Sequence, residues 1–340
     1  MRILMVMRIV VAAVALAGLA PGDRAIAQDK PQLRVGTGFG IAFLPFYIIE
    51  AQKLYESRAA AAGVANLQVT YQKFSGSAAM QDAVLSGNID IGGYGLSALL
   101  LAWDKARGGA NAVLGLTGIT TVPLVLVTSN PQINGLKDFT PKDRIAMPSL
   151  VSPQMYVLQM AAESAFGAGK HNELRGLVVG LPHPEAVNAL LSGGTEVNAY
   201  FSSPPFTSVV LRDPKVHRVL SSIDVFKGPS SFLVLCAPKR FAERNDALAK
   251  AVVAAMADAF AMIKQDPRKA AEIYLAAEPS KFLTVEAVEG LLKDPDNGFG
   301  LAPHGVMAYA GFMHKHGEIK SLPAKWQDVF LPFVHDQPGS

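Results

Sequence analysis

The stretch AVLSGNIDIGGYGLS at 83–97 has a second, looser copy in ALLSGGTEVNAYFSS at 189–203. Each copy predicts a helix end, a glycine stop, a short strand and a polar loop, in that order. Gly87 and Gly193 suit the left-handed position that closes a helix, because glycine has no Cβ to oppose a positive φ. The residues after each glycine include β-branched side chains, which favour a strand. The repeat therefore predicts two corresponding elements in two similar halves of the fold.

Strand and helix patterns alternate on both sides of a turn-rich segment, SNPQINGLKDFTPKD at 129–143. Before this segment, the pattern predicts helices at 45–55, at 78–87 with Ser77 as its cap, and at 98–106, between strands at 33–36, 67–74, 89–95, 113–119 and 124–129. After it, the alternation starts again as strand RIAMP, helix PQMYVLQMAAESAF, strand LVVGLP, helix PEAVNALLSG and strand EVNAYF. Repeated βαβ units predict mostly parallel sheets covered by helices.

A long helical tail follows the apolar strand SFLVLCAP at 231–238. Apolar residues at helical spacing predict one long helix that ends at Asp266-Pro267, and further helices at 268–276, 284–293 and 303–316. These helices have no strands of their own, so they are expected to pack on the first half of the chain. The predicted domains are a signal peptide at 1–27, lobe 1 at 28–128 and 237–340, and lobe 2 at 129–236. Crossover segments are expected near 127–135 and 228–237.

The first 27 residues have the pattern of a cleaved export signal. Two arginines precede an apolar run that is too short to span a membrane, and Ala25-Ile26-Ala27 has the small-x-small form that a signal peptidase recognises. We expect export to the periplasm, with cleavage near Ala27. The lone Cys236 has no partner for an internal disulfide and is expected to be a buried apolar side chain.

The charge of the chain argues against a polyanionic partner. The formal net charge is +3 for the full sequence, and loss of the signal's three arginines and Asp23 leaves +1. No run of basic residues stands out along the chain, so binding to nucleic acid is not expected.

Loops that follow the predicted strands carry the candidate ligand-binding residues, because ligands of open parallel sheets bind beyond the carboxyl ends of the strands. Hydroxyl groups and free N–H groups at helix starts favour an anion or a strong acceptor, and aromatic rings hold an apolar body. Ser77, Ser97 and Ser203 also stand where a hydroxyl can cap a helix. The predicted ligand-binding residues are Phe39, Phe43, Ser75, Ser77, Tyr94, Ser97, Thr121, Ser152 and Ser202.

No catalytic constellation emerges from the sequence. Among the histidines only His183 falls on a strand-end loop, and His314 and His316 diverge too far on their helix to share a metal ion easily. The stretch GTGFG at 36–40 lacks the spacing of a nucleotide-binding loop. We expect a protein that is not an enzyme and that binds neither a cofactor nor a metal.

Several motifs in order resemble the nitrate/sulfonate/taurine class of ABC-transporter substrate-binding proteins. They are LRVG followed by FLPFYIIEAQKLYE, a second strand that ends in FSGS, the doubled helix ends, and NGLKDF before RIAMPS. The resemblance implies an α/β fold of the type II periplasmic binding protein class, with two lobes, two crossover segments and a ligand cleft between the lobes. It also implies contacts at Phe39, Phe43, Ser75, Ser77, Tyr94, Ser97 and Ser152, and a membrane permease as the partner.

The resemblance implies a monomeric solute-binding component that closes by a hinge on a small organic ligand. A sulfonate, a taurine-like compound or another small anion is the first expectation. The segment YFSSPPF at 200–206 departs from the WDPY-like segment of the family, and the site loops carry no arginine. A neutral heteroaromatic such as a thiamine-pyrimidine precursor is the alternative ligand. A pyrimidine-synthase-like enzyme on the same fold and a sensory binding subunit are the alternative functions.

Overall fold

The structure, a computed structural model, describes residues 30–109 and 111–340. The predicted signal peptide at 1–27 lies outside the described residues. Pro31–Ser340 forms one compact unit. Among the described helices, none combines the length and the apolar character needed to cross a membrane.

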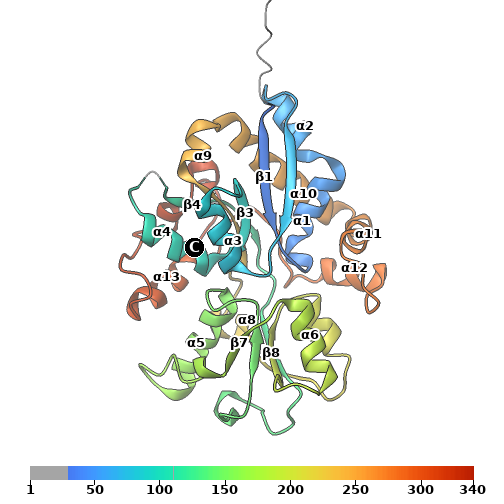
Figure 1. The fold of residues 1–340 in the computed structure, drawn as a ribbon, viewed down its shortest axis with the longest axis vertical. Coiled ribbons are helices and arrows are strands. Elements are labelled where there is room, and N and C mark those ends of the chain that lie inside the picture. The colour runs from blue at the N-terminus through green and yellow to red at the C-terminus, as the bar shows by residue number, and fades with distance from the viewer. Residues whose placement is uncertain (1–29, 110) are drawn as a thin grey trace, which may run out of the picture. The chain divides into compact units, whose positions relative to one another are not determined.

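The first sheet has the strand order β2-β1-β3-β10-β4 (Figure 1). β1 pairs in parallel with β2 and β3, whereas β10 runs antiparallel to β3 and β4. Its strands are β1 Gln32–Thr37, β2 Gln68–Lys73, β3 Ile91–Gly95, β4 Val113–Thr120 and β10 Leu233–Pro238. Apolar residues such as Leu33 and Val35 on β1 are fully buried, because helices cover the sheet.

The second sheet repeats this plan with the order β7-β6-β8-β5-β9. β6 pairs in parallel with β7 and β8, and β5 runs antiparallel to β8 and β9. Its strands are β5 Val125–Thr128, β6 Ile145–Met147, β7 Val178–Gly180, β8 Ala199–Ser202 and β9 His217–Ser221. The expectation of two similar α/β halves is confirmed, although the fourth strand of each sheet is antiparallel rather than parallel.

The antiparallel fourth strand of each sheet comes from the other half of the chain. β5 was expected in lobe 1, but it pairs with β8 and β9 of the second sheet. β10 was expected to lie mostly in lobe 2, but it fills the gap between β3 and β4 of the first sheet. The chain therefore crosses between the sheets at 121–124 and 222–232. The division into two lobes remains a prediction, now with shifted boundaries.

The doubled stretch occupies corresponding places in the two sheets. Helix α3 (Ser77–Ser86) leads into β3, and α6 (His183–Ser192) leads into β8, which are the third strands of their sheets. Gly87 and Gly193 end these helices in the left-handed conformation, with φ of 78° and 63°. The prediction that the repeat is architectural is confirmed by these elements.

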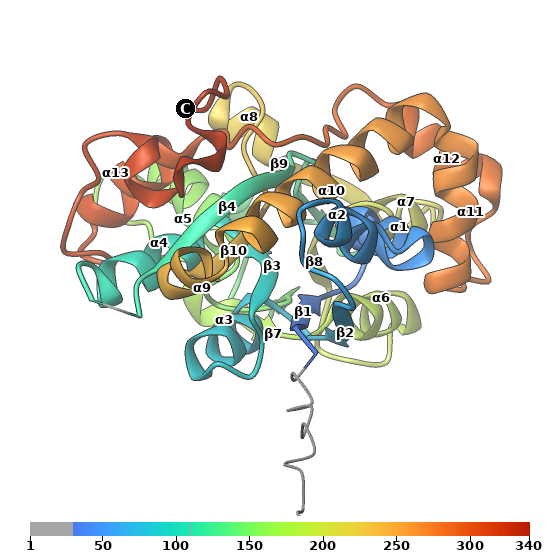
Figure 2. The ribbon, with the colours of Figure 1, turned by 90° about the horizontal axis from the view of Figure 1, so that it is seen from above.

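Two helices replace the single helix predicted at 45–55. α1 (Leu44–Gln52) ends at Lys53, which adopts a left-handed φ of 52°, and α2 (Leu54–Ala61) begins directly afterwards. Both helices pack against α10 (Asp246–Gln265), as Figure 2 shows. The first sheet is also covered by α4 (Leu96–Ala106), whose apolar face includes Trp103.

The helical tail packs on elements of the first sheet. α11 (Pro267–Ala277) contacts α1 and α12 (Val285–Lys293), and α13 (Val306–Lys315) contacts α4. The other helices are α5 Pro153–Phe166, α7 Phe206–Val210, α8 Ser222–Phe226 and α9 Lys239–Arg244. Short 3₁₀ helices are η1 Ile41–Phe43, η2 Leu136–Asp138, η3 Arg175–Leu177, η4 Trp326–Val329 and η5 Pro332–Val334.

Candidate functional site

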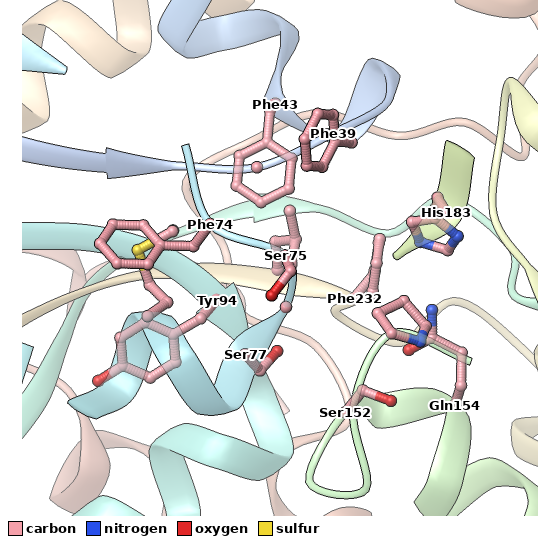
Figure 3. Close-up of a pocket in the computed structure, with 16 residues that line it drawn as sticks. Phe39, Phe43, Phe74, Ser75, Ser77, Tyr94, Ser152, Gln154, His183 and Phe232 are labelled. Carbon is pink, nitrogen blue, oxygen red and sulfur yellow. The ribbon is translucent and has the colours of Figure 1, made fainter. Parts of the chain in front are cut away.

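A cavity lies where the segments after β1 and β2 and the end of β3 meet the segments after β6 and β7 (Figure 3). The segment that enters β10 also contributes to it, through Phe232 and Leu233. The predicted ligand-binding residues that line this cavity are Phe39, Phe43, Ser75, Ser77, Tyr94 and Ser152. Segments from both sheets thus contribute to one site.

Three predicted residues do not line the cavity, and the hydroxyl groups of two of them, Ser97 and Ser202, are used within the fold. The Ser97 hydroxyl donates to the Val151 carbonyl at 2.7 Å, and the Ser202 hydroxyl donates to the Val125 carbonyl at 2.8 Å. Thr121 lies on the first crossover, where its N–H donates to the Gly298 carbonyl at 2.9 Å. Ser97 and Ser202 are fully buried.

The serines expected to cap helices make other contacts. α3 begins at Ser77 itself, and the Ser77 hydroxyl accepts a hydrogen bond of 3.1 Å from the Gly95 N–H. α4 begins at Leu96, so Ser97 lies inside the helix rather than before it. The capping expectation for these two serines is wrong, because both lie inside the first turn of their helices and their hydroxyl groups bond other segments. Ser77 instead ties the start of α3 to the end of β3.

Gln154 is the most informative lining residue that the sequence did not single out. It is the second residue of α5 and is 0% exposed. Neither its amide nitrogen nor its amide oxygen has a hydrogen-bond partner among the described residues. Figure 3 shows its amide end turned towards the side of the cavity where His183 lies. A buried amide without partners leaves one donor group and one acceptor available to a ligand.

His183 forms part of the cavity wall as the first residue of α6. Its Nδ1 hydrogen-bonds the Tyr200 hydroxyl, and its Nε2 lies 3.3 Å from the Ser203 hydroxyl. Its ring stacks on Phe206 with centroids 4.9 Å apart. Burial lowers the pKa of His183 to about 3, so the ring is neutral at physiological pH.

Apolar side chains complete the walls. Phe74, Met80 and Phe232 line the cavity together with the predicted aromatic residues. Figure 3 shows the Tyr94 hydroxyl pointing away from Ser75 and Ser77, so Tyr94 presents its ring to the site. Phe74 directly precedes Ser75, which is the signal in the sequence that could have identified it.

No charged side chain is among the described residues that line the cavity. The ion pair of Lys73 and Glu278, 3.4 Å apart, lies in a second, larger cavity of about 420 Å³ that Phe39 also lines. The Glu278 carboxylate accepts hydrogen bonds from the Gly40 N–H at 3.0 Å and the Tyr274 hydroxyl at 2.9 Å. The N–H group of Gly40, which precedes η1, is therefore already occupied by a protein carboxylate.

The two halves of the site approach each other through glycines. A Cβ atom on Gly95 would lie 2.3 Å from the Pro153 ring, and one on Gly76 would lie 2.8 Å from the Pro148 carbonyl oxygen. The cavity volume open to the centre of a water molecule is about 30 Å³, which is room for about two water molecules. A ligand of ring size therefore requires the facing loops or the aromatic side chains to move apart.

Solved structures of periplasmic binding proteins are similar to this fold. The alkanesulfonate-binding protein SsuA from Xanthomonas axonopodis pv. citri, bound to MOPS, has a TM-score of 0.67 and 18% identity, over 88% of this chain and 96% of that one. The aliphatic sulphonate-binding protein SsuA from Escherichia coli has a TM-score of 0.63 and 17% identity, over 88% and 98% of the two chains. The nitrate-binding protein NrtA from Synechocystis PCC 6803 has a TM-score of 0.63 and 12% identity, over 91% and 84%.

No curated protein sequence matches the chain. The model of the NMT1-like family matches residues 27–277, which is most of the sequence. The periplasmic binding protein fold expected from the sequence is confirmed by the two sheets and by the similar structures. The chain therefore belongs to the NMT1-like family.

Proposed function

We propose that this chain is the solute-binding component of an ABC importer, which holds a small organic ligand between its two sheets and delivers it to a membrane permease. It acts in the periplasm as a monomer, after the signal at 1–27 is removed, and does not convert its ligand. The family, the fold and a cavity with walls from both sheets support this function. Closure occurs by bending at the crossovers 121–124 and 222–232, which separate one lobe from the other.

We propose a neutral, planar heteroaromatic compound as the ligand. The observation that carries this choice is an uncharged, largely aromatic cavity with the unpartnered amide of Gln154 in its wall. Aromatic side chains such as Phe39 and Phe43 bind the faces or edges of a ring. An amide side chain pairs with a ring edge that offers an acceptor next to a donor, as an aminopyrimidine does.

A small anion such as a sulfonate is the second candidate. The hydroxyls of Ser75, Ser77 and Ser152 in the wall favour it, and two of the similar structures are sulfonate-binding proteins. Three features oppose it: the cavity has no cationic side chain, His183 is neutral, and Glu278 already takes the Gly40 N–H. Burying an anion without a cation or a full set of hydrogen-bond donors is unfavourable, because the site does not replace the hydration energy that the anion loses.

A thermal-shift panel with aminopyrimidines, alkanesulfonates, taurine and nitrate tests both candidates, because a ligand that binds only the folded state raises the melting temperature. We expect a shift with aminopyrimidines and none with the sulfonates. Mass spectrometry of the protein purified under native conditions identifies a retained ligand directly. Shifts from sulfonates alone would support the second candidate, and no shift from any compound together with no retained ligand would refute the function.

The variant Gln154→Leu tests the role of the amide. We expect it to weaken binding of an aminopyrimidine at least about tenfold, because one buried polar group on the ligand is left unpaired. Gln159→Leu is the matched control, since Gln159 is a buried glutamine of the same helix whose amide binds Asn172 instead of facing the cavity. Equal affinities in the two variants would remove Gln154 from the site.

A further inference from the structure

Two histidines and one glutamate converge far from the ligand cavity. Glu163 lies near the end of α5, His171 in the segment that follows α5, and His316 directly after α13. One ligand atom from each residue can be chosen so that all three atoms lie within 4.8 Å of one another. Because α5 belongs to the second sheet's half and α13 packs on α4, the cluster joins the two halves.

The contacts within the cluster bring nitrogen and oxygen atoms close together. His316 Nε2 lies 3.2 Å from the Glu163 carboxylate, and the His171 and His316 ring centroids are 3.8 Å apart. The Glu163 and His316 side chains are only 15% and 7% exposed. The Glu163 carboxylate also accepts hydrogen bonds from Lys315 Nζ at 2.9 Å and from the Gly169 N–H at 3.1 Å.

We propose that Glu163, His171 and His316 bind one divalent transition-metal ion of the zinc type. Two imidazoles and one carboxylate are a ligand set that zinc accepts, with metal–ligand bonds of about 2.0–2.2 Å and a fourth position open to water. Tetrahedral geometry with such bonds places ligand atoms roughly 3.4 Å apart. The present upper limit of 4.8 Å therefore needs a contraction that side-chain rotation supplies.

The surroundings of His171 fit a metal ligand. Its Nδ1 atom is buried and has no hydrogen-bond partner among the described residues. Its Nε2 lies 2.9 Å from the Asn172 amide, which in turn binds Gln159 at 2.8 Å. If the side-chain amides of Asn172 and Gln159 are each rotated by 180°, both contacts remain and the Asn172 oxygen accepts a hydrogen bond from the His171 Nε2–H group. The lone pair of His171 Nδ1 is then available to the metal. Such a chain of polar groups typically orients a ligating histidine.

Lys315 is the cationic group that pairs with the Glu163 carboxylate in this structure. Its Nζ lies 2.9 Å from the Glu163 carboxylate, and its side chain is 59% exposed. This ammonium group can move into water when a dication takes its place beside the carboxylate. The bound ion would then tie α5 to the end of α13 and hold the two halves of the protein together. This inference does not depend on the identity of the ligand in the cavity.

The test uses full-length mature protein without a polyhistidine tag, stripped with a chelator and then dialysed. Zinc chloride is titrated into it by calorimetry, and its melting temperature is measured with and without zinc. We expect one zinc per chain and a rise of the melting temperature of about 2 °C or more at saturation. Magnesium chloride should give no shift, because magnesium prefers oxygen ligands.

Three variants separate this site from adventitious binding. His171→Ala and His316→Ala should each weaken zinc binding at least about tenfold. His314→Ala should bind as the wild type does, since His314 is an exposed histidine in the last turn of α13, two residues before His316. Glu163→Gln keeps the shape of the third ligand but removes its charge, and it should also weaken zinc binding. It provides the test if an alanine variant fails to fold. Absence of a zinc shift in the wild type, or wild-type affinity in these cluster variants, would overturn the proposal.

Discussion

His183→Asn tests whether the imidazole in the cavity wall is neutral. Burial lowers the pKa of His183 to about 3 in the folded protein, whereas an exposed histidine has a pKa of ~6.5. Between these pH values the unfolded chain binds more protons than the folded protein, so the free energy of unfolding falls as pH falls below about 6.5. From pH 7 to pH 5 this group alone removes about 2 kcal/mol, at about 1.4 kcal/mol for each pH unit below 6.5.

The assay is urea unfolding at pH 7, 6 and 5, followed by circular dichroism. In the variant, the asparagine amide takes the place of Nδ1 beside the Tyr200 hydroxyl but does not titrate. We expect it to be less stable than the wild type at pH 7 and to lose about 2 kcal/mol less on acidification. Tyr200→Phe is the control, because it keeps the buried imidazole and so keeps the wild-type pH dependence. Equal losses in wild type and His183→Asn would refute a neutral, buried imidazole.

Two substitutions and one labelling experiment test the packing of the chain. Gly95→Ala places a Cβ atom 2.3 Å from the Pro153 ring, so we expect the halves to separate; small-angle scattering should show a larger radius of gyration, and an unchanged radius would contradict the close approach. Gly87→Ala puts a side chain at a φ of 78° and should lower the free energy of unfolding by about 1 kcal/mol, measured in urea; no loss would argue against the left-handed cap. Cys236 is 0% exposed and burial raises the pKa of its thiol, so a thiol reagent should label it only after unfolding; rapid labelling of native protein would contradict its position on β10.

Helices and their ends were predictable because the residues that determine them lie within the element or next to it in the sequence. α5 begins at Pro153 and ends at Phe166 as the pattern PQMYVLQMAAESAF predicts, since proline suits the first turn and glycine follows the last residue. The glycine stops at Gly87 and Gly193 were predictable for the same reason. The sheet that β5 joins was not, because an apolar strand sequence does not identify its pairing partner.

The candidate site was predictable only as a set of loops. Ser75, Ser77 and Ser152 line the cavity because strand ends gather at one edge of each sheet. Whether a serine faces a ligand or a carbonyl depends on neighbours distant in sequence, so Ser97 and Ser202 could not be excluded in advance. Gln154 lies in the first turn of a helix, and its lack of partners is decided by residues distant in sequence that surround it in the folded protein. The partner of His316 is likewise on another element, and not at the neighbouring His314.

The exchange of fourth strands affects how the polypeptide folds during synthesis. β3 and β4 do not pair with each other, since β10 lies between them. The upper sheet of Figure 1 therefore stays open along its middle until residues 233–238 leave the ribosome, after the whole second sheet. Pairing over such a long sequence separation is slow. The nascent protein thus exposes an unpaired apolar edge for much of its translation, which is the kind of surface that chaperones bind.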